Sequence, residues 1–222
     1  PIEAIIMSNI IQTVLYKGGE GDYHTYRIPS IISTSDGTIL AFCEGRKDSM
    51  SDAGDIDILL KRSTDNGRTF SDIQIVVTDP GHTCGNPAPV QDMDTGIIWM
   101  LFNKNLSDGP EDMILEGKAP RTVWVTYSEN GGKSWAKPKD ITSDVKLSDW
   151  TWYATGPCHG IQLKSGRLLI PCDHNTLGDY NAYSHCVYSD DHGKTWQIGG
   201  STDAGANECT ALETTDGWLY LN

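Results

Sequence analysis

The sequence predicts an all-β fold, a β-propeller of four-stranded blades, and two internal repeats lead to this prediction. The first is an octapeptide with the pattern S-x-D-x-G-x-T-W/F, found at residues 63–70, 128–135 and 189–196. The second is an X-Gly dipeptide between two apolar runs, starting at Asp36, Thr95, Ser165 and Asp216. The turn glycines are 59, 70 and 51 residues apart, a period typical of propeller blades. A β-sandwich with unrelated turns is the alternative.

Each X-Gly dipeptide predicts a hairpin between the first and second strand of a blade. The predicted strand pairs are 28–34 with 38–45, 88–93 with 97–103, 159–164 with 167–173, and 209–215 with 218–222. A third strand precedes each octapeptide, at residues 55–62, 121–127 and 183–188. The chain therefore contains three blades and the first two strands of a fourth. We expect residues 1–222 to be the N-terminal part of one propeller domain that requires its remainder.

The octapeptides are expected to close the hairpins between third and fourth strands. The Asp or Asn side chain can accept hydrogen bonds from backbone amides, and Gly supplies a left-handed turn. The aromatic residue is expected to cap the hairpin from the core side. The second copy departs from the pattern, because Asn130 and Ser134 replace Asp and Thr. We expect these turns to be structural and remote from any active site.

The composition excludes several classes of function. The net charge of -13 argues against binding to nucleic acid or to an anionic membrane surface. No apolar run approaches the roughly 20 residues that span a bilayer. The six cysteines lack the spacing of a zinc site, so either buried thiols or some disulfide bonds are possible. His159 and His174 have no third ligand at a suitable spacing, and no metal or other cofactor is predicted.

Polar residues gather at one end of the predicted propeller. The start of a first strand and the end of a second strand lie at the same end of a blade, opposite the turns. Arg27 stands there at the head of an apolar strand, although arginine is almost never buried without a partner. The same end receives Glu44, Arg46, Asp52, Asn86, Asn103, Asp173, His174, Asn207 and Glu208. A binding site on a rigid scaffold is therefore predicted at this mouth.

Several motifs resemble those of one known family. Residues 26–29, "YRIP", resemble the (F/Y)-R-I-P motif of sialidases (neuraminidases), and the octapeptides resemble their Asp boxes. "GRKDSMSDAGDID", "GNPAPV", "WTWYATGPCHGIQL" and "NECTALE" follow in the order expected of that family. The resemblance covers nearly the whole chain. It implies a six-bladed β-propeller, of which this chain supplies about three blades plus half of a fourth.

The resemblance also implies an exo-α-sialidase activity and residue roles. Asp52 resembles the general acid/base, and Glu208 the carboxylate that activates a tyrosine nucleophile. Arg27 resembles the first of three arginines that bind the substrate carboxylate, while Arg46 and Asn86 resemble contacts to the 4-substituent and N-acyl regions. The other two arginines and the tyrosine are expected beyond Asn222. A tyrosine suits this substrate, because an anionic nucleophile would be repelled by the carboxylate at the anomeric carbon.

Alternatives remain open for the site carboxylates, for two tryptophans and for the function. Asp48, Asp55 and Asp57 compete with Asp52, and Glu213 competes with Glu208. Trp150 and Trp152 could either form a wall of the site or pack in the core. The protein could instead be a trans-sialidase, or a non-catalytic Asp-box propeller that binds glycans or proteins.

The expected partner is a sialylated glycoconjugate, with no nucleic acid and no membrane span. A secreted, periplasmic or cell-surface location is expected from this substrate, although no targeting segment is visible.

Overall fold

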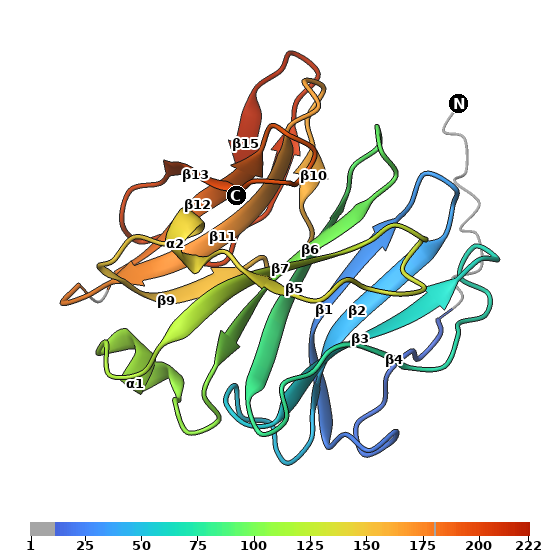
Figure 1. Cartoon of the computed structure of the whole chain (residues 1–222), viewed down its shortest axis with the longest axis horizontal. Helices are drawn as coiled ribbons and strands as arrows, with labels where there is room; N and C mark the ends of the chain where they lie inside the picture. The colour runs from blue at the N-terminus through green and yellow to red at the C-terminus, as the bar shows by residue number, and fades with distance from the viewer. Residues whose placement is uncertain (1–11, 180) are drawn as a thin grey trace, which may run out of the picture.

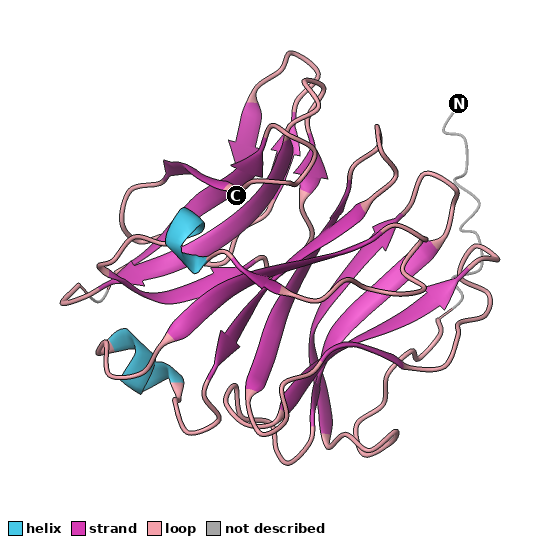
Figure 2. Cartoon of the chain, in the orientation of Figure 1, coloured by secondary structure: helices cyan, strands magenta, loops and turns pink. Residues whose placement is uncertain are grey.

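The computed structural model describes residues 12–179 and 181–222 (Figure 1). Strands dominate these residues, and the two helices are short (Figure 2). The predicted all-β class is therefore confirmed. No helix in the described residues is long and apolar enough to cross a membrane.

The first two antiparallel units each contain four strands. In the first unit the strands are β1 (Thr25–Ser33), β2 (Ile39–Arg46), β3 (Ile56–Ser63) and β4 (Gln74–Val77). In the second they are β5 (Thr83–Gln91), β6 (Ile98–Asn105), β7 (Arg121–Ser128) and β8 (Lys139–Asp140), with α1 (Glu111–Leu115) before β7. One parallel strand pairing joins the two units, between Ile56 and Thr83.

The third unit has an inner strand in two pieces, and the fourth has two strands. The inner pieces are β9 (Trp150–Thr155) and β10 (Ile161–Gln162), which both pair with β11. The other elements are α2 (Thr142–Val145), β11 (Leu168–Thr176), β12 (Ala182–Ser189), β13 (Gln197–Ser201), β14 (Ala211–Glu213) and β15 (Leu219–Leu221). The strand pairing thus follows the order that the sequence repeats predict.

The octapeptide turns share one hydrogen-bond pattern. In the third copy the Ser189 hydroxyl donates to Asp191 Oδ1 (2.8 Å) and accepts the backbone N–H of Gly193 (2.8 Å). Asp191 also accepts the backbone N–H (2.9 Å) and the hydroxyl (2.6 Å) of Thr195. The first copy repeats these contacts with Ser63, Asp65, Gly67 and Thr69.

The second octapeptide keeps this geometry despite its two substitutions. Asn130 Oδ1 accepts the backbone N–H of Ser134 (2.9 Å), as Asp191 does for Thr195. The side-chain bond is reversed, because Asn130 Nδ2 donates to the Ser134 hydroxyl (2.8 Å). An amide therefore replaces the carboxylate without loss of a hydrogen bond.

The tryptophans of the second and third octapeptides connect neighbouring units. Trp135 contacts Phe42 of the first unit edge to face, with ring centroids 5.8 Å apart. Trp196 contacts Trp99 of the second unit in the same way, at 6.4 Å. Each tryptophan therefore packs on the preceding unit and does more than cap its own hairpin. These contacts belong to two buried apolar clusters, one between the first and second units and one between the second and third.

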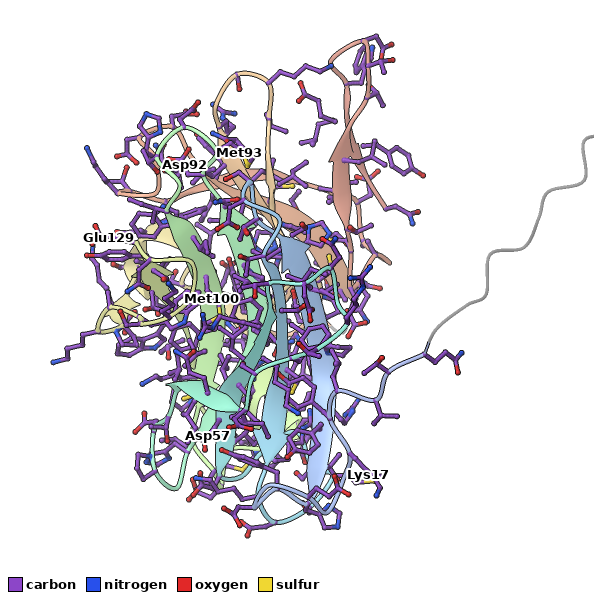
Figure 3. All side chains as sticks on the ribbon, turned by 90° about the vertical axis from the view of Figure 1, so that its right-hand side faces the viewer. Lys17, Asp57, Asp92, Met93, Met100 and Glu129 are labelled. Carbon is purple, nitrogen blue, oxygen red and sulfur yellow. The ribbon has the colours of Figure 1, made fainter. Side chains whose placement is uncertain are left out.

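The antiparallel strand order places the octapeptide turns at one end of the molecule and the starts of β1, β3, β5 and β7 at the other. Figure 3 shows Asp57, near the start of β3, and Asp92, in the turn after β5, at opposite ends, with Met100 between them. The octapeptide turns share the end of Asp92, since the His192 ring nitrogen Nδ1 lies 3.0 Å from Asp92 Oδ2. The starts of β1, β3, β5 and β7 lie at the other end.

The six cysteines are free thiols, and five of them are buried. Cys158 is half-buried. The described residues therefore contain no disulfide bond, and the alternative of buried thiols is the one the structure supports.

Two glycines, Gly193 and its control Gly67, allow a test of the packing between the second and third units. A Cβ on Gly193 would lie 2.1 Å from Trp99 Cε2, whereas one on Gly67 would meet nothing closer than Ile39 Cδ1 at 3.5 Å. Both glycines have a left-handed φ, near +86° and +78°. In the intact protein, Gly193→Ala is expected to lower the free energy of unfolding by about 3 kcal/mol or more, and Gly67→Ala by about 1 kcal/mol. Chemical denaturation measures both, and equal losses would contradict the proposed packing.

Candidate active site

All five residues predicted for the site line one cavity of about 170 Å³. They come from different elements, because inner strands and loops of successive units converge at the mouth. Arg27 lies on β1, Arg46 on β2, Asp52 in the following loop, Asn86 on β5 and Glu208 in the loop before β14. Other lining residues are Ile28, Glu44, Thr83, Glu111, Arg121, Trp152, Ala154, Asp173 and Asn207. The structure thus brings the predicted set together.

The competing residues lie elsewhere. Asp48, Asp55 and Asp57 do not line the cavity, and Lys47 Nζ binds both Asp55 (2.7 Å) and Asp57 (3.2 Å). Glu213 accepts the backbone N–H of Lys164 (2.7 Å) outside the cavity.

The two tryptophans have separate roles. Trp152 lines the cavity, whereas Trp150 is buried and stacks on His174, with ring centroids 3.6 Å apart.

The inner strands bulge where they pass the cavity. In β1 the register shifts between Arg27 and Ser30, and Ile28 has a φ of 51°. In β5 it shifts between Gly85 and Ala88, and Asn86 has a φ of 56°. A left-handed conformation is costly for these residue types, and β-bulges re-aim side chains next to active sites. Two strained backbones at equivalent places therefore support a functional site.

A proline follows each strained residue. Pro29 follows Ile28 and Pro87 follows Asn86, as Pro157 follows Gly156 (φ 86°) between β9 and β10. Within sheets, proline is found at edges and bulges because it cannot donate a ladder hydrogen bond. The repeated X-Pro pair is therefore a sequence signal for the bulges that the sequence analysis missed.

Arg27 and Asp52 form an ion pair at the cavity mouth. Arg27 Nη1 lies 2.9 Å from Asp52 Oδ1, and the two side chains are 46% and 54% exposed. The arginine that heads an apolar strand is thus half exposed and not buried in the protein. An accessible guanidinium can bind a carboxylate through two parallel hydrogen bonds.

Arg46 has different surroundings, with a side chain that is 2% exposed. Its guanidinium donates to Glu44 Oε2 from Nε (3.0 Å) and from Nη2 (2.6 Å). It also donates to Asp52 Oδ1 (2.6 Å) and to the carbonyl oxygen of Met50 (2.6 Å). Arg46 therefore fixes the Asp52 loop against β2. Its direct contact with a sugar stays a prediction.

A chain of buried hydrogen bonds continues into the second and third units. Glu44 Oε1 accepts the backbone N–H of Asn86 (2.9 Å), and Asn86 Oδ1 accepts a hydrogen bond from Arg121 Nη2 (2.6 Å). Arg121 also donates to Asn105 Oδ1 (2.7 Å) and to the carbonyl oxygen of Tyr153 (2.6 Å). The side chain of Asn86 is thus held in place by Arg121.

Arg121 is a site residue that the sequence analysis missed. Its guanidinium lies 4.0 Å from the ring centre of Trp152, and burial lowers its pKa to about 10, although Glu44 opposes this shift. The signal that identified Arg27, a charged residue at the head of an apolar strand, applies equally to Arg121 in "RTVWVTY".

Three further carboxyl groups line the cavity: Glu111 from the second unit, Asp173 from the third and Glu208 before the fourth. Burial raises the pKa of Asp173 to about 7, and the nearby Glu208 adds to this shift while Arg121 opposes it. Burial also raises the pKa of Glu111, and Asp52 adds to that shift. Glu208 itself is exposed. The cavity thus combines arginines that can bind an anion with acids that can exchange protons.

Comparisons with known proteins agree with these observations. Residues 37–222 match a family model described as a BNR repeat-like domain. An exo-alpha-sialidase of Aspergillus fumigatus is 35% identical in an alignment 220 positions long, which covers 90% of this chain and 52% of that relative. Human sialidase-4 is 33% identical over 95% of this chain and 48% of its own length. The chain spans about half the length of the curated relatives it matches.

Solved structures show the same fold. The Hadza microbial sialidase Hz136 superposes with a TM-score of 0.83 at 27% identity, over 90% of this chain and 42% of that one. The sialidase of Trypanosoma rangeli superposes with a TM-score of 0.73 at 21% identity, over 90% and 34% of the two chains. The predicted family and the propeller fold are confirmed, while the count of six blades stays a prediction.

The buried pair of Glu44 and Arg46 yields a stability prediction. In the intact protein, Glu44→Gln leaves Arg46 with one carboxylate partner in place of two, and is expected to lower the free energy of unfolding by about 3 kcal/mol. Glu116→Gln is the control, because Glu116 pairs with Lys118 (2.6 Å) on the exposed surface and should change stability little. Chemical denaturation compares the two variants. A loss at Glu44 no greater than that at Glu116 would refute the structural role of the buried pair.

Proposed function

Because this chain belongs to the BNR repeat-like domain family and is similar to sialidases over most of its length, we propose that the intact protein is an exo-α-sialidase. It would hydrolyse terminal α-linked sialic acid from glycoconjugates with retention of configuration. The observation that carries this proposal is the cavity that joins Arg27, Asp52 and Glu208 from three parts of the chain. A secreted, periplasmic or cell-surface location is proposed for the same reason, since such substrates are displayed outside the cytoplasm.

The proposed role of Arg27 is to bind the substrate carboxylate. Its guanidinium is half exposed, and its partner in the described residues is Asp52. An incoming carboxylate would take the place of Asp52 on this arginine. Asp52 would remain in the cavity, because Arg46 Nη2 also holds it at 2.6 Å.

The exchange would prepare Asp52 for acid catalysis. Loss of Arg27 as a partner would free Oδ1 of Asp52 from one of its two arginines and let it face the glycosidic oxygen. A protonated Asp52 would give its proton to the leaving glycosidic oxygen. The resulting carboxylate would then take a proton from the attacking water in the second step.

Glu208 is proposed to activate a tyrosine supplied by the rest of the protein. A tyrosine hydroxyl has a reference pKa of about 10, so it needs a nearby base to become nucleophilic. Glu208 is exposed at the cavity wall and is therefore accessible to another part of the chain. Asn86 and Arg46 are proposed to contact the N-acyl and 4-substituent regions of the sugar.

Turnover of a methylumbelliferyl α-sialoside by the intact protein tests the function. Asp52→Ala is expected to lower kcat/KM by about 10²–10⁴-fold, because it removes the acid/base. Arg27→Ala is expected to lower it by about 10²-fold, because it removes a charged contact with the carboxylate. Product analysis by NMR should show that the α-anomer is released first.

The matched control is the exposed pair of Arg167 and Asp190. Their two hydrogen bonds measure 2.7 and 2.8 Å, and neither residue lines the cavity. Arg167→Ala and Asp190→Ala should turn over substrate at the wild-type rate. Wild-type activity in both Asp52→Ala and Arg27→Ala would exclude the proposed mechanism. A wild-type protein that binds sialosides without turnover would favour the non-catalytic alternative.

A further inference from the structure

Asp173 is the buried acid of the cavity that has no assigned role. It lies on β11, between Ala154 of β9 and Ser184 of β12 in the strand register, and is 1% exposed. Its Oδ1 atom has no hydrogen-bond partner among the described residues. The other buried charged groups of the wall are partnered, since Arg46 binds Glu44 and Arg121 binds Asn86. Asp173 therefore differs from the other buried charged residues of the cavity wall, because one of its oxygens has no partner.

The free-energy cost of burying Asp173 depends on whether its carboxyl group is protonated. The backbone N–H of Ala154 favours the carboxylate of Asp173, but Oδ1 has no donor, so this oxygen loses solvation without compensation when the group is charged. A carboxylic acid is neutral and can itself donate a hydrogen bond. The charge of the buried Arg121 acts on Asp173, but no ion pair within 4.0 Å joins the two among the described residues. Geometry thus favours the protonated acid.

The charges that face Asp173 act in both directions. Arg121 at the start of β7 favours the carboxylate, whereas Glu208 before β14 and Glu111 on α1 favour the acid. Burial is the largest contribution and also favours the acid; it outweighs Arg121 and the backbone N–H of Ala154 and gives a pKa of about 7. The neighbouring titratable groups Tyr153, Cys172 and Cys209 have pKa values raised by burial, so they stay neutral near that pH.

We propose that Asp173 is a substrate-binding residue that holds a proton in the free protein and donates a hydrogen bond to an acceptor oxygen of the bound sugar. This inference rests on the proposed function, since it takes the ligand to be a sialic acid, which offers hydroxyl, ring and acyl oxygens. No bond is broken and the proton stays on Asp173. Above neutral pH the residue ionises, loses its donor and repels an anionic ligand.

The test is the pH dependence of kcat/KM for a methylumbelliferyl α-sialoside with the intact protein, from pH 5 to pH 9. Wild type should lose kcat/KM as the pH rises through about 7. Asp173→Asn has the same shape and donates at every pH, so it should retain turnover at pH 5 and lose this alkaline fall. Asp173→Leu cannot donate and should have a kcat/KM about tenfold lower at pH 5.

Asp57 provides a matched control. It is also 1% exposed and also has an unpartnered Oδ1 atom, but it binds Tyr23 and Lys47 and lies outside the cavity. Asp57→Asn should keep the wild-type pH profile. The inference is overturned if Asp173→Asn keeps the alkaline fall of wild type, or if Asp57→Asn removes it.

A second measurement does not depend on turnover. The pKa of Asp173 is raised from 3.8, so its contribution to stability is complete below about pH 4 and is lost as the pH rises through about 7. The free energy of unfolding of Asp173→Asn, relative to wild type, should therefore increase over this range. If wild type hydrolyses no sialoside but this difference appears, the proposed function fails and the protonation of Asp173 stands. If the difference is absent, the proton on Asp173 is refuted.

Discussion

The buried guanidinium of Arg46 is the interaction on which the mouth of the molecule depends. It joins the second strand of the first unit to the Asp52 loop, and its other partner, Glu44, receives the backbone N–H of Asn86 from the second unit. Asn86 in turn accepts a hydrogen bond from Arg121, which binds the carbonyl oxygen of Tyr153 in the third unit. Three units that share apolar interfaces elsewhere are thus connected by polar contacts at the cavity.

This chain of contacts holds one of the two strained backbones beside the cavity, that of Asn86. Ile28 and Asn86 adopt left-handed conformations beside the cavity, and each such residue costs about 1–3 kcal/mol. The backbone N–H of Asn86 donates to Glu44, and Arg46 in turn donates to Glu44. Contacts within the protein therefore hold the strained conformation of Asn86 without a ligand. A site whose side chains are locked before a ligand arrives loses less conformational entropy on binding.

Local patterns in the sequence predict most of the fold and part of the site. The X-Gly turns, the octapeptides and the apolar runs each specify a hairpin within a few residues, and strand alternation then assigns Arg27, Asp52 and Glu208 to one end. Strand alternation also assigns Asp173 to that end, but its burial with an unpartnered oxygen depends on the packing of other units. Arg121 carries the same sequence signal as Arg27, whereas its contacts with Asn86 and Trp152 arise only from that packing. The split between β9 and β10 also depends on the path of residues 156–160 across the third unit. The contact of Trp196 with Trp99 is likewise set by the stacking of units.

The strong negative charge of the chain does not conflict with the proposed binding of an anion at this mouth. Surface charges are screened beyond about 8 Å at physiological ionic strength, so most of the net charge of -13 has little effect inside the cavity. Three arginines and five carboxylic acids line the wall, which makes the charge state of each acid important. Glu44 is neutralised by Arg46, and a protonated Asp173 adds no charge. Replacement of Asp52 on Arg27 by a ligand carboxylate exchanges one anion for another on the same cation, so the arginine never lacks a counter-charge.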